Sequence, residues 1–230
     1  MPRARVVAAG LLAAAAVLAS ACGSSAPTAS PERLLQQAKT VLDATNAVHF
    51  TITSQAVSKS GTNVVGGDGD LARPNQLAGT FQVQLAGFTV SVKVIDVGNK
   101  FYAEPPFQTT YTATNPNNYG LGNPADLLST SVGVSDMLAT AEDPTSAGTV
   151  RLSGELLDQV HAQVAGKNVP VLPDLAPSVP VSMLVGIDPT THQLRQVALT
   201  GPFTSTSSST TYTVTLTNYG ESFTATLPTS

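Results

Sequence analysis

The sequence predicts an α+β fold in which a large antiparallel sheet is interrupted by a few short helices. Several segments alternate apolar and polar residues with a period of two, which is typical of strands with one buried face. One early segment has helical periodicity instead, and two short apolar groups between the early and late strands indicate further helices. Of the 230 residues, 42% are hydrophobic and 11% are charged, so the chain can form a substantial core.

The first predicted element is an amphipathic helix. Ser30-Pro31-Glu32 has the features of a helix start, with a capping serine, a proline at the first helical position and an acid in the first turn. We expect the helix to end near Asn46 and a strand to begin at Val48, where the period changes to two. The apolar residues at helical spacing are Leu34, Leu35, Ala38, Val41 and Leu42.

The clearest local pattern is a hairpin that joins two alternating runs. Phe81–Leu85 and Phe88–Val94 alternate apolar and polar residues, and only Ala86-Gly87 separates them. A two-residue turn at that point would place every large apolar side chain on one face of the hairpin. The expected cross-strand pairs are Leu85 with Phe88, Val83 with Val90, and Phe81 with Val92.

Further strands are predicted where the alternation recurs later in the chain. A second hairpin would pair Val181–Ile187 with Leu194–Leu199. The other predicted strands are Lys100–Ala103, Thr149–Ser153, Val160–Ala165, Tyr212–Leu216 and Phe223–Leu227. The sheet is therefore expected to be large and antiparallel.

Two short helices and one proline-rich loop are expected to interrupt this sheet. Asn123-Pro124 caps the first helix, which carries Leu127 and Leu128. The prolines at 170, 173, 177 and 180 cannot donate to a sheet ladder, so this segment is predicted to be a loop or the edge of a lid. The second helix carries Val134, Met137, Leu138 and Ala141.

The amino terminus predicts a secreted lipoprotein. Residues 1–21 combine two arginines, an uncharged apolar run and small residues before a cysteine, which is typical of a signal peptide. The position of Cys22, the only cysteine, resembles a lipobox, in which the thiol accepts a diacylglyceryl group. The alternative is ordinary secretion with cleavage nearby and a free thiol. We expect residues 22–30 to form a flexible, lipid-anchored tether and residues 31–230 to form a single domain.

The net charge of the chain argues against some classes of partner. Removal of Arg3 and Arg5 with the signal peptide leaves nine Lys and Arg against fifteen Asp and Glu, a net charge of about −6. This balance argues against nucleic-acid binding, which needs clustered cations. It also predicts that the lipid anchor, and not a basic patch, holds the protein on the outer face of the cell membrane, in the cell envelope.

The sequence offers no pattern of catalytic residues, cofactor or metal ligands. The three histidines have no partner at ligand spacing, and no Gly-x-Ser-x-Gly elbow is present, so we expect no metal, no cofactor and no enzymatic activity. Asp68 and Asp70 lie among glycines and could offer oxygens to calcium, but a solvated turn is the favoured interpretation. Glu142-Asp143 is interpreted as a helix end that runs into a turn.

The order of these features resembles the LppX/LprA/LprF/LprG family of actinobacterial, mycobacterial-type lipoproteins. The stretches that carry the resemblance are Val97–Tyr102, Asn123–Leu128 with Val132–Val134 and Met137-Leu138, Asp188–Leu199, and Leu216–Glu221 running to Pro228. Together they span nearly all of residues 32–228.

The resemblance implies a strongly curved half-barrel sheet, with helices on its concave side, that encloses an apolar cavity similar to those of the LolA and LolB carriers. It implies that the ligand is an acyl lipid or glycolipid, of the triacylglycerol or lipoglycan type. It also implies transport from the cytoplasmic membrane toward the outer envelope, in some members beside a major-facilitator exporter.

Two alternatives stay open at this point. The candidate residues for the cavity wall fall into two groups: Phe81, Val83, Leu85, Phe88, Val90 and Val92 in the hairpin, and Leu127, Leu128, Met137 and Leu138 in the helices. From their pattern alone, the same residues are equally consistent with a filled core. The alternative to a carrier is a sensor or scaffold that contacts a membrane transporter or kinase.

Overall fold

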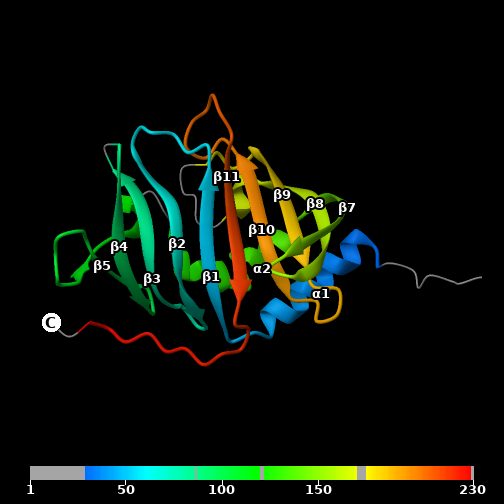
Figure 1. Ribbon diagram of the computed structural model, residues 1–230, viewed down its shortest axis with the longest axis horizontal. Helices are drawn as coiled ribbons and strands as arrows, with labels where there is room; N and C mark the ends of the chain where they lie inside the picture. Colours follow the sequence, from blue (N-terminus) through cyan, green and yellow to red (C-terminus); the bar gives the residue numbers. More distant parts are fainter. Residues whose placement is uncertain (1–28, 86, 120–121, 170–174, 229–230) are drawn as a thin grey trace, which may run out of the picture.

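The computed structural model describes residues 29–85, 87–119, 122–169 and 175–228 (Figure 1). The helical elements are α1 (Pro31–Asp43), η1 (Pro116–Tyr119), η2 (Pro124–Leu128), α2 (Val134–Ala139) and η3 (Gly166–Asn168). The strands are β1 (Ala47–Gln55), β2 (Thr62–Ala72), β3 (Gln76–Leu85), β4 (Phe88–Val97), β5 (Lys100–Glu104), β6 (Thr112–Ala113), β7 (Glu142–Leu152), β8 (Glu155–Ala165), β9 (Pro180–Ile187), β10 (Leu194–Gly201) and β11 (Thr210–Thr217).

All eleven strands form one antiparallel sheet with the order β6-β5-β4-β3-β2-β1-β11-β10-β9-β8-β7. The N-terminal half, β1 to β6, and the C-terminal half, β7 to β11, are each a meander, and the pairing of β1 with β11 joins them. Figure 1 shows the sheet curving around α1 and α2. The fold predicted from the sequence, a curved antiparallel sheet with helices on the concave side, is therefore confirmed. We call the face toward the helices the inner face.

The helix α1 forms where the sequence predicts it. The hydroxyl of Ser30 accepts a hydrogen bond from the backbone N–H of Arg33 at 3.4 Å, which caps the first turn. The helix ends at Asp43, three residues earlier than expected. Its apolar stripe is buried against the sheet and consists of Leu34, Leu35, Ala38 and Leu42.

The β3–β4 hairpin has the predicted register. Phe81 pairs with Val92, Val83 with Val90, and Leu85 with Phe88. Ala86 lies outside the described residues. The second predicted hairpin is also confirmed, because β9 pairs with β10.

The interpretation of Asp68 and Asp70 as part of a solvated turn is wrong. Both residues lie within β2, which pairs with β1 on one side and with β3 on the other. One of the glycines that suggested a turn, Gly67, instead gives room to the inner face. A Cβ atom on Gly67 would stand 2.9 Å from the ring of Phe81, so a larger residue there would displace that ring.

Two further predictions at element ends are wrong. Glu142-Asp143 begins β7, and the preceding helix ends at Ala139. Residues 223–227 are not a strand. Since β1 already pairs with β2 and β11, no free edge faces this tail, which instead runs past the strand ends (Figure 1). The backbone N–H of Ala225 donates to the side-chain oxygen of Gln76 at 2.9 Å.

Several predictions fall outside the described residues. They include the signal peptide, Cys22, most of the tether, and the prolines at 170 and 173. Pro177 is in a turn and Pro180 begins β9. Within the part of the chain that the structure describes, no helix is long and apolar enough to cross a membrane.

Candidate functional site

An apolar row runs along the inner face of β3 and β4. Phe81, Val83 and Val92 are buried, whereas Val90 is half-buried. The last pair of the row, Leu85 and Phe88, is exposed at the tip of the hairpin. The alternation therefore correctly predicts which face these residues share, but the helices do not cover that face as far as the tip.

A small apolar cavity lies beside the buried part of this row. Its volume is about 10 Å³, which is just enough for a single water molecule. Phe81, Val83, Val92, Val94 and Phe101 form its wall on the sheet, and Pro116, Tyr119 and Pro124 form its roof. The hollow expected between the sheet and the helices is thus present beside the middle of the hairpin, but it is only large enough for one water molecule.

The four helical candidates are buried in the same core without lining this cavity. Leu127 and Leu128 lie on η2, and Met137 and Leu138 lie on α2. Leu128 faces a 200 Å³ hollow beside Arg73 and Pro74 instead. Leu138 lies in a 430 Å³ groove between α1 and the start of β7.

Five residues of the cavity were missed in the sequence analysis. Val94 continues the alternating row, and Phe101 follows the same alternation on β5, so a longer reading of the pattern would have found both. Pro116, Tyr119 and Pro124 come from the connection between the two halves of the sheet, which has no periodicity. No signal in that connection indicates that its residues form the roof.

One buried acid ends the inner row of β4. Asp96 is fully buried, pairs with Leu77 and Phe101, and neither of its carboxylate oxygens has a hydrogen-bond partner among the described residues. Burial raises the pKa of Asp96, and the charge of Asp126 adds to this effect. The Asn123 amide and the backbone N–H groups of Asn99 and Lys100 are near enough to offset it in part, but none of them makes a hydrogen bond of ordinary geometry to the carboxylate. The base of the apolar row therefore carries a carboxyl group that is poorly solvated.

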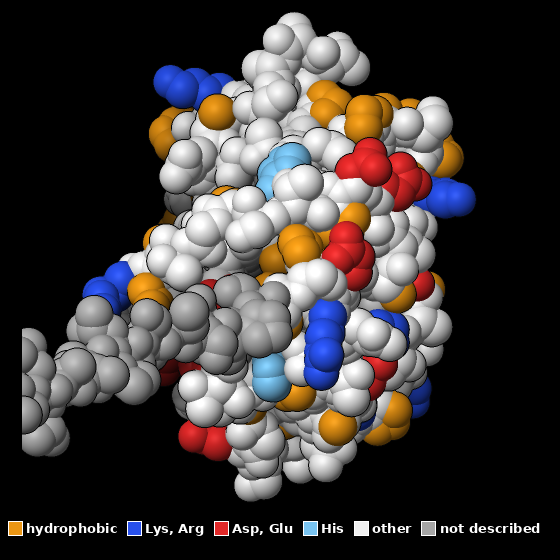
Figure 2. All heavy atoms as spheres, turned by 90° about the vertical axis from the view of Figure 1, so that its right-hand side faces the viewer, with side chains coloured by type: hydrophobic (Ala, Val, Ile, Leu, Met, Phe, Trp, Pro, Cys, Tyr) orange, Lys and Arg blue, Asp and Glu red, His pale blue; other side chains and the backbone are white. Residues whose placement is uncertain are grey.

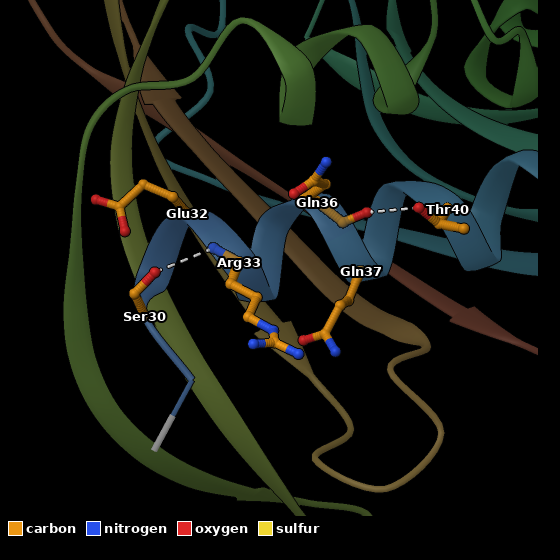
Figure 3. A pocket seen from close by; sticks show the side chains of 6 residues that line it. All are labelled: Ser30, Glu32, Arg33, Gln36, Gln37 and Thr40. Carbon is orange, nitrogen blue, oxygen red and sulfur yellow. Dashed lines mark hydrogen bonds between the residues drawn. The ribbon is translucent and has the colours of Figure 1, made fainter. Parts of the chain in front are cut away.

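The larger hollows described at the surface are polar or mixed. A 600 Å³ depression lies along the exposed side of α1, and Figure 3 shows that its lining consists of polar side chains. These are Ser30, Glu32, Arg33, Gln36, Gln37 and Thr40. Figure 2 shows the neighbouring face of the molecule, where acidic, basic and apolar side chains are interspersed. Neither surface offers the apolar lining that an acyl chain needs.

The outer face of the sheet carries one histidine between two acids. The Nδ1 atom of His49 lies 2.9 Å from Asp70, and its Nε2 atom lies 3.2 Å from Asp68. Partial burial lowers the pKa of His49, but the two carboxylates outweigh burial and raise it overall. The carboxylates lie on different ring nitrogens and do not converge on one point. In the described ranges, no group of three or more histidine, cysteine, aspartate or glutamate residues could hold a metal ion.

Comparison with known proteins identifies the family. A family model of the LppX_LprAFG lipoproteins matches residues 30–225. The structure of LprF from Mycobacterium bovis is similar, with a TM-score of 0.69 and 16% identity over 87% of this chain and 97% of that one. The Mycobacterium tuberculosis lipoprotein LppX gives a TM-score of 0.58 and 13% identity over 85% of this chain and 98% of that one. No curated protein matches the chain.

At these identities the two solved structures show a shared fold. A LolA superfamily protein from Nitrosomonas europaea aligns over 85% of this chain and 95% of that one, with 6% identity and a TM-score of 0.32, which is too low to support an argument. The family match covers the whole described fold, from the cap of α1 to the C-terminal tail. The chain therefore belongs to the LppX_LprAFG lipoprotein family.

Proposed function

We propose that this protein binds the acyl chains of a lipid or glycolipid between the N-terminal half of its sheet and the η1–η2 roof. In this proposal it carries the lipid from the cytoplasmic membrane toward the outer envelope while its own lipidated Cys22 anchors it to the outer face of the membrane. The observation that supports it is the apolar cavity, whose sheet wall is built only from Phe and Val side chains. The lipoprotein family to which the chain belongs is consistent with this role.

A carrier of this kind needs an apolar enclosure more than it needs polar contacts. A sixteen-carbon chain exposed to water costs roughly 12 kcal/mol, at about 0.8 kcal/mol per methylene. Because the donor and acceptor membranes are also apolar, the cavity only has to match them. Aliphatic and aromatic walls such as those of β3 and β4 meet this requirement without a specific anchor.

The cavity must widen to admit a chain, since pockets for small ligands measure about 300–1,000 Å³. The roof is the part suited to move. η1 has no buried residue, and Pro116 and Tyr119, which face the cavity, are only half-buried. Displacing η1 therefore exposes little apolar surface, whereas separating β3 from β4 would break a ladder of ten residue pairs.

The experiment is to purify the chain with Cys22→Ser, which removes the lipidation site, and to extract and identify the lipids bound to it. Val90 lies on the inner face opposite Val83, a wall residue of the cavity, so a tryptophan there should obstruct the cavity, and we expect Val90→Trp to retain several-fold less acyl lipid. Thr89→Trp is the matched control, because Thr89 is exposed on the outer face of the same strand. It should retain the amount found in the parent chain.

The small cavity volume specifically favours a second candidate, a sensor or scaffold that binds a membrane protein through its surface. In that case the parent chain would carry no extractable acyl lipid, and Val90→Trp would leave its lipid content unchanged. That result would contradict the carrier proposal.

A further inference from the structure

The inner row of β3 and β4 connects the buried cavity to solvent. At its base, Phe81 and Val92 are buried against the roof. Val90 is half-buried in the middle, and at the tip Leu85 is 49% and Phe88 is 75% exposed. Every second pair of an antiparallel ladder lies on the same face, so Phe81–Val92, Val83–Val90 and Leu85–Phe88 form one continuous apolar track.

The tip of this track, Leu85 and Phe88, lies in an uncharged part of the chain. No Lys, Arg, Asp or Glu occurs between Arg73 and Lys93. The β2 residues opposite the end of β3 are uncharged as well, since Thr62 pairs with Leu85 and Asn63 with Gln84. Between the tip and Lys93, neither β3 nor β4 carries a charged group. Moving the tip out of water therefore does not remove the hydration of any charge on these two strands.

The size and shape of the tip suit a lipid surface better than a protein. At these exposed fractions one phenylalanine and one leucine offer roughly 200–250 Å² of apolar area, since a large aromatic buries about 150–250 Å² in full. A stable protein interface needs about 800 Å² per partner. A narrow wedge of two apolar side chains on a tight turn can insert between lipid headgroups without covering such an area.

We propose that the β3–β4 tip inserts into the surface of a lipid bilayer, and that the track behind it is the path by which an acyl chain passes between bilayer and cavity. This inference rests on the proposed lipid-binding function and specifies where the lipid enters. The net negative charge makes a zwitterionic surface the expected target, since anionic headgroups would repel the protein.

The test measures flotation of the Cys22→Ser chain with phosphatidylcholine vesicles. The double variant Leu85→Ser/Phe88→Ser should lower the partition coefficient at least 10-fold. The matched control is Leu156→Ser/Val132→Ser, which removes a leucine that is 48% exposed and a valine that is 50% exposed, neither of which lies on β3, β4 or the segment that follows β5. The control should bind vesicles like the parent chain, and the tip variant should also take up acyl lipid from the vesicles more slowly.

Three outcomes overturn the inference, and a fourth separates it from the proposed carrier function. Equal losses in both double variants would indicate general hydrophobic adsorption. Unchanged binding of the tip variant would show that the tip does not touch lipid. Loss of self-association by the tip variant, measured by sedimentation without vesicles, would identify a second copy of the chain as the occupant. If vesicle binding is tip-dependent but the parent chain retains no acyl lipid on extraction, the proposed carrier function fails while tip insertion stands.

Discussion

The two halves of the sheet are covered differently. In the C-terminal half, the inner residues of β8 and β9 are sealed beneath α1, and Val160, Met183, Val185 and Ile187 have no exposed surface. In the N-terminal half, the inner row of β3 and β4 passes from buried to exposed over five pairs of residues, and its cover consists of short 3-10 segments. One half is packed as a closed core, and the other is left partly open.

This difference predicts that the two halves contribute differently to stability and to ligand binding. A closed core loses contacts on all sides when one side chain is shortened. A row that already borders a cavity has fewer contacts to lose and more room to change. We therefore expect the C-terminal half to set the free energy of unfolding and the N-terminal half to accommodate a ligand.

The largest expected effect compares two valines. Val185 has a cross-strand partner on each side, Val160 on β8 and Val197 on β10. Val92 has a partner only on β3, where it pairs with Phe81, because its pairing with β5 begins one residue later, at Lys93. We expect Val185→Ala to lower the free energy of unfolding by about 2–3 kcal/mol and Val92→Ala to lower it by about 1 kcal/mol less. Urea denaturation measures both. Equal losses would remove the distinction between the halves.

A smaller effect is expected at the buried acid of the N-terminal half. Burial raises the pKa of Asp96, so the folded protein is favoured below the ordinary pKa of 3.8 and loses stability as the pH rises from there through the raised pKa. Asp96→Asn removes this penalty and should stabilise the protein by about 1–2 kcal/mol at pH 7. Thermal unfolding between pH 3 and pH 7 should show the advantage of the variant disappearing at the acidic end. A destabilised variant at pH 7 would mean that the carboxylate has partners that stabilise its charge.

The smallest effect concerns β1, the strand at the junction of the two halves. The two carboxylates raise the pKa of His49 above 6.5, so the pairing stabilises the fold below that value and is lost as the pH rises through the raised pKa. Because Asp68 and Asp70 are largely exposed, solvent screens the pairing, and we expect His49→Gln to cost about 0.5 kcal/mol at pH 5.5. At pH 9 the variant and the parent should unfold at the same urea concentration. A constant difference at both pH values would show that the role of His49 is packing and not charge.

Strand pairing can be predicted from the sequence better than which strand residues the helices cover. The β3–β4 register follows from strict alternation around Ala86-Gly87, which is local information. The exposure of Leu85 and Phe88 depends on how far the roof extends, and the roof comes from a distant segment without periodicity. β2 could not be predicted because its glycines, including Gly67, which makes room for Phe81, also resemble turn residues. The volume of the cavity depends on packing among β3, β4, β5, η1 and η2, which no single pattern encodes.

The most direct test of the account is to locate a bound acyl chain by photocrosslinking. A lipid with a diazirine at the end of its palmitoyl chain would be incubated with the Cys22→Ser chain, and the crosslinked peptides would be identified by mass spectrometry. The account predicts crosslinks to peptides that contain Val83, Val92 or Tyr119, and their loss in the Val90→Trp variant. Crosslinks confined to the surface hollows beside α1, or no crosslinks at all, would contradict it.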